Sequence, residues 1–235
     1  MALPILNSTP SYEVTIPSTG QAVTYRPFLV KEQKNLLIAL ETQDRKDLLR
    51  AITRTIRACV EVDLDAHLTT FDVDYLFTMI RSKSVGETIE IQLPCSECNA
   101  DNVTKVDLEG ITIANPVVDP TVQLSPSITI KMRYPTYEEF LDNDALSQAK
   151  TQAEIIFELI LICMDSVLTD EERIDLKVEP REDVVAFIES MTTSQYEKIA
   201  SFINGIPFVY KDIEYTCSSC GHENVRTLKG MDDFF

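Results

Sequence analysis

Two Cys-x-x-Cys motifs, Cys95/Cys98 and Cys217/Cys220, constrain the fold of this 235-residue chain more than any other feature. Each motif follows a strand-like run, and each is followed four residues later by the dipeptide Asn-Val. The strand-like runs are Ile89–Leu93 and Ile213–Tyr215. The chain therefore contains one strand–knuckle–strand unit twice, at an offset of 122 residues. We call residues 95–98 knuckle 1 and residues 217–220 knuckle 2.

The four cysteines of the two knuckles match the ligand set of a structural zinc site. A closed tetrahedral site needs four ligands, and one Cys-x-x-Cys supplies only two of them. Two knuckles that face each other supply all four, so the sequence predicts one Zn²⁺ held by Cys95, Cys98, Cys217 and Cys220. An ion with four protein ligands has no open position, so it would stabilise the fold and would not activate water.

Other interpretations of the cysteines stay open at this point. A disulfide within each motif needs an oxidising compartment, and the first residues of the chain lack an export-signal pattern. A thioredoxin-like redox pair needs a single motif at the start of a helix, whereas the residues after each knuckle are typical of turns. His222, two residues after Cys220, could replace a cysteine as a metal ligand. The lone Cys59 and Cys163 lie on apolar helical faces and are expected to fill core space.

The composition is that of a globular protein, with 44% hydrophobic and 25% charged residues. No apolar run reaches the roughly 20 residues of a membrane span. The formal net charge of -17 disfavours nucleic-acid binding, because phosphates are bound by Lys and Arg with release of counterions. An acidic surface suits solubility or contact with a basic protein partner.

The order of apolar patterns predicts an α+β fold made of helical blocks, short antiparallel strands and a split zinc-ribbon-like unit built from the two knuckles. Strand patterns cover residues 12–16, 23–25, 110–114 and 127–133, and helix patterns cover about 30–43, 48–60, 72–80, 151–163, 182–191 and 194–204. We expect two halves, 1–108 and 109–235, each ending with or containing one knuckle. The shared zinc site would pack the two halves as one unit.

Several residues are expected to begin or end helices. Asp72 can cap the third helix, and Thr136 with Glu139 forms a capping-box pattern, as does Ser194 with Glu197. Gly205 is a stop signal for the last helix. The side chains expected to be most buried are Ile156, Leu159 and Ile160, followed by Leu36, Leu37, Ile52 and Leu76.

No catalytic grouping is recognisable, so we predict no catalytic residues, no small-molecule substrate and no site for an organic cofactor. The chain has two histidines, His67 and His222, and a surface role is the default for His67. A face with Arg50, Arg54 and Arg57 is interpreted as solvated, and it is the only local feature that favours nucleic acid. The terminal Phe234 and Phe235, which follow two aspartates, either dock on a partner or fold back on the chain itself.

Several short strings of residues occur in a specific order along the chain. They are Leu3-Pro4, Ile16–Gly20, Arg26–Glu32 with Leu36-Leu37 and Glu41, Phe71–Phe77, Arg81–Glu87 before the first Cys-x-x-Cys, and Met132–Pro135. Together they resemble the T4-like bacteriophage baseplate hub protein family. The resemblance covers roughly the whole chain and is densest up to Cys98.

This resemblance implies a non-enzymatic structural or assembly protein of the baseplate hub in a contractile phage tail. Its partners would be other baseplate and hub proteins, and it would be assembled in the host cytoplasm and located in the virion. Two alternatives stay open. One is a hub assembly chaperone that is absent from the mature virion, and the other, of a different class, is a zinc-ribbon regulator that binds nucleic acid.

Overall fold

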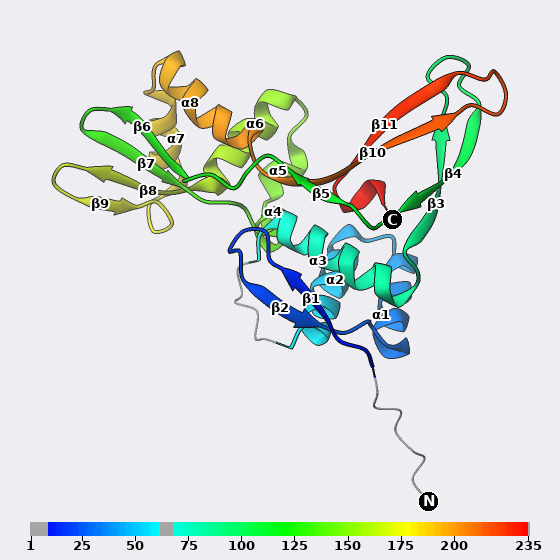
Figure 1. The fold of residues 1–235 in the computed structure, drawn as a ribbon. Helices are drawn as coiled ribbons and strands as arrows, with labels where there is room; N and C mark the ends of the chain where they lie inside the picture. The colour runs from blue at the N-terminus through cyan, green and yellow to red at the C-terminus, as the bar shows by residue number, and fades with distance from the viewer. Residues whose placement is uncertain (1–8, 62–67, 235) are drawn as a thin grey trace, which may run out of the picture. The chain divides into compact units, whose positions relative to one another are not determined.

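The computed structural model describes residues 9–61 and 68–234, so His67 and Phe235 lie outside the described residues. Helices alternate with four small antiparallel sheets (Figure 1), which confirms the expectation of an α+β fold. The chain divides into two compact units. Unit 1 comprises Met1–Ala114 and Phe208–Phe235, and unit 2 comprises Asn115–Pro207.

This division differs from the expected halves, 1–108 and 109–235. The second half of the chain supplies all of unit 2 and also the last strands of unit 1. The reason is a long-range strand pairing, in which Phe208 lies opposite Ala114 in an antiparallel ladder. Unit 2 is therefore an insertion between two neighbouring strands of a unit 1 sheet.

The described residues of unit 1 form three helices, seven strands and one turn of 3-10 helix. They are β1 (Tyr12–Thr15), β2 (Ala22–Tyr25), α1 (Val30–Glu41), α2 (Arg45–Cys59), α3 (Thr70–Ser84), β3 (Thr88–Pro94), β4 (Asp101–Asp107), β5 (Thr112–Ala114), β10 (Phe208–Thr216), β11 (Glu223–Lys229) and η1 (Met231–Asp233). The sheets are β1-β2, β3-β4 and β11-β10-β5, all antiparallel.

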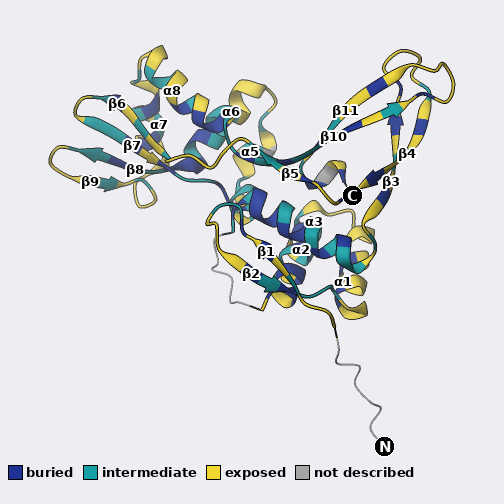
Figure 2. Ribbon diagram, in the orientation of Figure 1, coloured by how far each residue is buried: buried dark blue, intermediate teal, exposed yellow. Residues whose placement is uncertain are grey.

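Helix α3 is the most buried helix of unit 1 (Figure 2), with nine of its residues buried. It begins at a capping box, in which Thr69 is the N-cap residue and Asp72 accepts from the Thr69 N–H at 3.0 Å. Asp72 also accepts from the Ser18 N–H at 2.8 Å. The predicted N-cap position of Asp72 is therefore wrong, because Thr69 is the N-cap residue and Asp72 completes the capping box from the N3 position.

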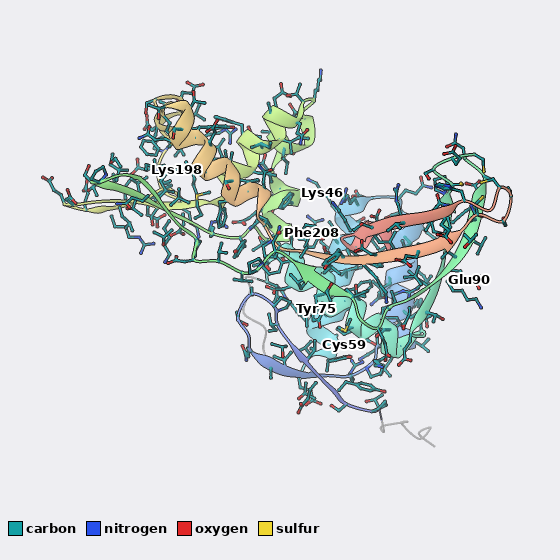
Figure 3. The ribbon with its side chains drawn as sticks, turned by 45° about the horizontal axis from the view of Figure 1, so that its top comes forward. Lys46, Cys59, Tyr75, Glu90, Lys198 and Phe208 are labelled. Carbon is teal, nitrogen blue, oxygen red and sulfur yellow. The ribbon has the colours of Figure 1, made fainter. Side chains whose placement is uncertain are left out.

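Arg26 connects the start of α1 to the end of α2. Its Nη2 donates to Glu32 Oε1 at 3.0 Å and to the Ala58 carbonyl at 2.8 Å, and its Nη1 lies 3.7 Å from the Cys59 sulfur. Glu32 also accepts from the Leu29 N–H at 2.8 Å, in the first turn of α1. Cys59, labelled in Figure 3, is buried as expected for a core-filling cysteine.

The main apolar cluster of the knuckle-bearing strands includes the end of the chain. Phe234 is 1% exposed and packs in this cluster, whose other buried members are Ile89, Leu93, Val106, Leu108, Ile111, Val209, Ile213 and Leu228. Tyr75 of α3, labelled in Figure 3, packs against the same cluster. Of the two interpretations of the C-terminus, docking on a partner is therefore wrong for Phe234, and folding back on the chain itself is confirmed.

Unit 2 has one four-stranded sheet, in the order β6-β7-β8-β9, and five helices. The elements are β6 (Thr121–Ser125), β7 (Ile128–Met132), α4 (Tyr137–Asp142), α5 (Asp144–Gln148), α6 (Gln152–Cys163), β8 (Met164–Thr169), β9 (Arg173–Asp175), α7 (Arg181–Glu189) and α8 (Thr193–Asn204). The capping box of Thr136 and Glu139 at α4 is confirmed. The predicted box at Ser194 is wrong, because Thr192 and Gln195 form it two residues earlier.

The core of unit 2 lies between its sheet and helices α6, α7 and α8. Ile160 and Cys163 are completely buried, as predicted. Ile156 and Leu159 are only partly buried and pack at the edge of this core, so their expected rank is wrong. Leu37 of unit 1 is also a correction, because 53% of it is exposed while its neighbour Leu36 is buried.

None of the helices in the described part of the chain has both the length and the apolar character that crossing a membrane requires.

Candidate metal centre

The two knuckles lie at the ends of two β-hairpins of unit 1. Knuckle 1 joins β3 to β4, and knuckle 2 joins β10 to β11. The structure brings the four predicted cysteines together, with all four Sγ atoms within 4.8 Å of one another. The distance from Cys95 Sγ to Cys220 Sγ is 3.7 Å, and Cys98 Sγ to Cys217 Sγ is also 3.7 Å.

These distances fit a metal-centred tetrahedron of sulfurs. A Zn–S bond of about 2.3 Å places tetrahedral ligands about 3.8 Å apart, close to the spacing in this cluster. A disulfide would need about 2.05 Å between two sulfurs, and all six cysteines of the chain are free. The arrangement therefore differs from the disulfide interpretation and is compatible with a four-sulfur metal site.

The His222 side chain is not a member of this group of ligand atoms, and it is exposed. The residue contributes to the site through its backbone, since its carbonyl accepts from the Cys217 N–H at 2.8 Å. The same bond occurs in knuckle 1, where the Ala100 carbonyl accepts from the Cys95 N–H at 2.9 Å. Ala100 and His222 are separated by the offset of 122 residues, so the two knuckles have the same backbone design.

One residue with a positive φ directly follows each knuckle. Asn99 has a φ of 55° and Gly221 a φ of 76°, and the two positions again differ by 122 residues. Their N–H groups donate to the first cysteine carbonyl of their own knuckle, at 3.0 Å and 2.9 Å. Asparagine and glycine are the residues that enter this backbone region most easily, so each sequence favours the tight turn that brings its two sulfurs to one side.

Two buried asparagines connect each knuckle to the other hairpin. Asn102 Oδ1 accepts from the Ser218 N–H at 2.9 Å and from the Ser218 hydroxyl at 3.1 Å. Asn224 Oδ1 accepts from the Ser96 N–H and hydroxyl, both at 2.9 Å. The two carboxamides thus form a reciprocal clamp, which we call the asparagine clamp.

The amide nitrogens of the asparagine clamp point toward sulfur. Asn102 Nδ2 lies 3.7 Å from Cys217 Sγ, and Asn224 Nδ2 lies 3.6 Å from Cys95 Sγ. Groups that hydrogen-bond to metal ligands fix their orientation and tune the site. The Asn-Val dipeptides mark the repeat in the sequence, but this role of the asparagines was not predicted from them. The clue was that both asparagines recur at the offset of the cysteines.

Hydrogen bonds to sulfur favour the thiolate at the first cysteine of each knuckle. The Cys98 N–H is the main group that lowers the pKa of Cys95. The Cys220 N–H is the main group that lowers the pKa of Cys217, to about 6. Cysteines bind metal ions as thiolates, so these two sulfurs are prepared for that role.

Cys220 behaves in the opposite way. The His222 N–H acts to lower its pKa, but hydrogen bonds with Cys98, burial and the hydrogen bonds with Cys217 and Cys95 outweigh it and raise the pKa to about 12. Four thiolates so close together would repel one another, so loss of all the protons is unfavourable unless a cation is bound among the sulfurs. A metal ion supplies that positive charge and favours deprotonation of its ligands.

One comparison with known proteins gives a match. A family model described as T4 bacteriophage base plate protein matches residues 9–235, which is essentially the whole chain. No curated protein and no solved structure matches the chain. Because the match extends over both units and both knuckles, the chain belongs to the T4 bacteriophage base plate protein family.

Proposed function

We propose that this protein is a non-enzymatic structural or assembly component of the baseplate hub in a contractile phage tail, and that it acts through contacts with other baseplate proteins. The family match supports the baseplate part of this proposal. The hub assignment rests on the resemblance of the short strings from Leu3 to Pro135. The protein would work in the virion tail after assembly in the host cytoplasm.

We further propose that Cys95, Cys98, Cys217 and Cys220 hold a structural Zn²⁺. The observation that carries this proposal is the cluster of four sulfurs within 4.8 Å of one another. Four cysteines form a closed zinc site of the kind that stabilises a fold. The ion would join hairpin β3–β4 to hairpin β10–β11, which are connected in sequence only through β5 and unit 2.

Metal analysis of protein prepared without chelators tests the identity of the ion. We expect one zinc per chain. Tetrahedral sulfur sites also suit iron, so iron in place of zinc would keep the site and correct the ion. Protein that carries no metal after expression in medium supplied with zinc would overturn the metal proposal.

Mass spectrometry of purified virions tests the place of the protein in the tail. A stoichiometric amount in intact virions supports a component of the finished baseplate. Absence from virions, together with failed baseplate assembly when the gene is deleted, supports the alternative of a hub assembly chaperone. Normal tails in the deletion strain would overturn both.

The zinc-ribbon regulator remains the alternative from a different class. Its support is the face with Arg50, Arg54 and Arg57 on α2, whereas the net charge of -17 opposes it. A gel-shift assay at low salt separates the two classes, because electrostatic binding to phosphates is strongest there. Sequence-independent retention of DNA at low protein concentration would favour the regulator.

A further inference from the structure

A surface groove of about 620 Å³ runs between α1 and α2 of unit 1. Eight of its twelve lining residues are polar or charged, and the other four have small or apolar side chains. These four, Ile38, Ala39, Ala51 and Ala58, are called the apolar floor below. Ile38 is 50% exposed, although it is a large aliphatic residue. The groove therefore offers apolar contact area, and the small alanine side chains let another chain approach the two helices closely.

The rim of this groove carries three cations. Lys31 of α1 has a 70% exposed side chain and lies 3.4 Å from Glu32, whose carboxylate is already bonded to Arg26. The side chain of Arg50 of α2 is 54% exposed, and its ion-pair partner within the described residues is Asp47, at 3.8 Å. The Lys31 ammonium is therefore an exposed second partner of a buried carboxylate, and Arg50–Asp47 is a long, exposed pair of the kind that contributes little.

Arg54, one turn after Arg50, is the third cation of the rim. It is exposed, and the described residues provide no ion-pair partner for it. The guanidinium of Arg54 is therefore exposed to solvent and available to a carboxylate of a partner.

The charge of the helix pair contrasts with the rest of the chain. Residues 30–59 contain seven basic and four acidic side chains, a net charge of +3, in a chain whose net charge is -17. All other residues together therefore carry -20. Helix α2, whose first turn is marked by Lys46 in Figure 3, holds five of these seven cations. A local sign reversal of this kind steers a partner of opposite charge to one place on the surface.

We propose that the α1–α2 groove binds an acidic amphipathic helix of another protein. The apolar side of that helix lies on Ile38 and the alanines, and its carboxylates meet Lys31, Arg50 and Arg54. From Lys31 to Thr42, α1 lines the groove over about 17 Å, which corresponds to about three turns of a bound helix. This inference rests on the proposed function, in which the protein acts through contacts with other baseplate proteins. It specifies the chemistry of one such contact.

A protein helix fits the groove better than a nucleic acid does. The apolar floor would face a polyanion without any matching group. A duplex also extends beyond the groove into the field of the remaining -20 charges, whereas a helix of three turns does not need to.

A synthetic peptide of about 14 residues serves as the probe. It carries a leucine stripe at helical spacing with glutamates on both flanks, and a control peptide has lysine in place of every glutamate. Fluorescence anisotropy with the full-length protein should show binding of the glutamate peptide only. The binding should weaken with salt and be lost near 1 M, where the Debye length falls to about 3 Å.

Two variants test the groove itself. Arg50→Glu/Arg54→Glu should weaken binding of the glutamate peptide at least tenfold. Ile38→Glu should also weaken it, because the change places a carboxylate where the leucine stripe of the peptide packs. Because all three side chains are exposed, circular dichroism should show an unchanged fold. The matched control is Lys105→Glu/Lys131→Glu, which makes the same change in net charge at exposed strand positions and should leave affinity within about twofold of the wild type.

Three results would overturn the proposal. They are no binding of the glutamate peptide at low salt, equal weakening by the control variant, and tighter binding of a 14-base-pair DNA duplex that is lost in the Arg50→Glu/Arg54→Glu variant. The last of these would assign the groove to nucleic acid. None of the three changes the metal content or the presence of the protein in virions, so failure here is distinct from failure of the proposed function.

Discussion

Asn102 of β4 and Asn224 of β11 each bind the knuckle of the other hairpin. Each carboxamide oxygen accepts from a serine N–H across the site, at 2.9 Å, and each amide nitrogen approaches a cysteine sulfur across it. Both side chains are buried, at 6% and 5% exposure. The two knuckles are therefore held in register by protein contacts as well as by any metal they share.

The asparagine clamp should tune the metal site without supplying a ligand. Asn224→Ala removes the acceptor for Ser96 and the contact with Cys95 Sγ, and loss of such supporting groups typically weakens metal binding about 10- to 100-fold. Competition with a zinc chelator would measure this change. The neighbouring Val225→Ala is the control, because Val225 is 71% exposed and should have no effect. Equal zinc affinity in both variants would show that the clamp only serves packing.

Removal of one ligand should release the metal. Cys217→Ser leaves three thiolates and should lower the zinc content from one per chain to near zero, together with a clear fall in melting temperature. Elemental analysis and thermal unfolding would follow both effects. Ser219→Ala, at an exposed position of the same knuckle, is the matched control. Full zinc content in Cys217→Ser would contradict the proposed ligand set.

Glu32 should make unfolding depend on pH. Burial acts to raise its pKa, but hydrogen bonds from Arg26 and the Leu29 N–H, with the charge of Arg26, outweigh it and lower the pKa below 4.5. A lowered pKa in the folded state stabilises the protein above the unfolded-state pKa, and this contribution disappears as the pH falls through the folded-state value.

Glu32→Gln should therefore cost about 1.5–3 kcal/mol at pH 7, the usual worth of hydrogen bonds to a charged group. The difference from the wild type should shrink as the pH falls below the unfolded-state pKa of about 4.3 and through the lower folded-state pKa. Urea unfolding at pH 7 and at an acidic pH below the unfolded-state pKa measures the free-energy difference. The exposed Glu41→Gln is the control. A difference that is the same at both pH values would show that packing, not charge, is responsible.

The last residues should contribute to stability. Phe234 is 1% exposed within the cluster of the knuckle-bearing strands, so Phe234→Ala should cost about 3–5 kcal/mol. A chain that ends at Met231 should show a similar loss, measured by chemical unfolding. Asp233→Ala, which keeps the aromatic residue, controls for the hydrogen bond from the Lys229 N–H. An unchanged free energy of unfolding for the truncated chain would place the phenylalanine outside the core.

The sequence predicted the grouping of the four cysteines better than it predicted the packing. The candidate ligand set follows from motif spacing and an internal repeat, and the structure brings these four side chains together. Local signals also succeeded where the interaction lies within one turn of helix, as in the capping box of Thr136 and Glu139 at α4. These features depend on residues that are close in sequence or repeated in it, so a pattern can reveal them.

Features that depend on distant partners could not be predicted. The apolar spacing of α1 does not show how many sides of the helix are covered, so Leu37 was expected in the core although α1 buries Leu36 and Ala39 instead. The pairing of β10 with β5 joins residues about 95 positions apart, and no local pattern marks it. The same holds for Phe234, because its burial depends on strands from both knuckles.

The insertion of unit 2 also has a consequence for how this protein can be modified. Ala114 and Phe208 are direct neighbours in an antiparallel ladder, so their Cα atoms are only about 5 Å apart. A two-residue hairpin turn can span that gap. Unit 1 can therefore be rebuilt as a continuous chain by grafting a short turn in place of residues 115–207. A foreign module whose termini lie close together could be placed at the same point without rethreading any strand.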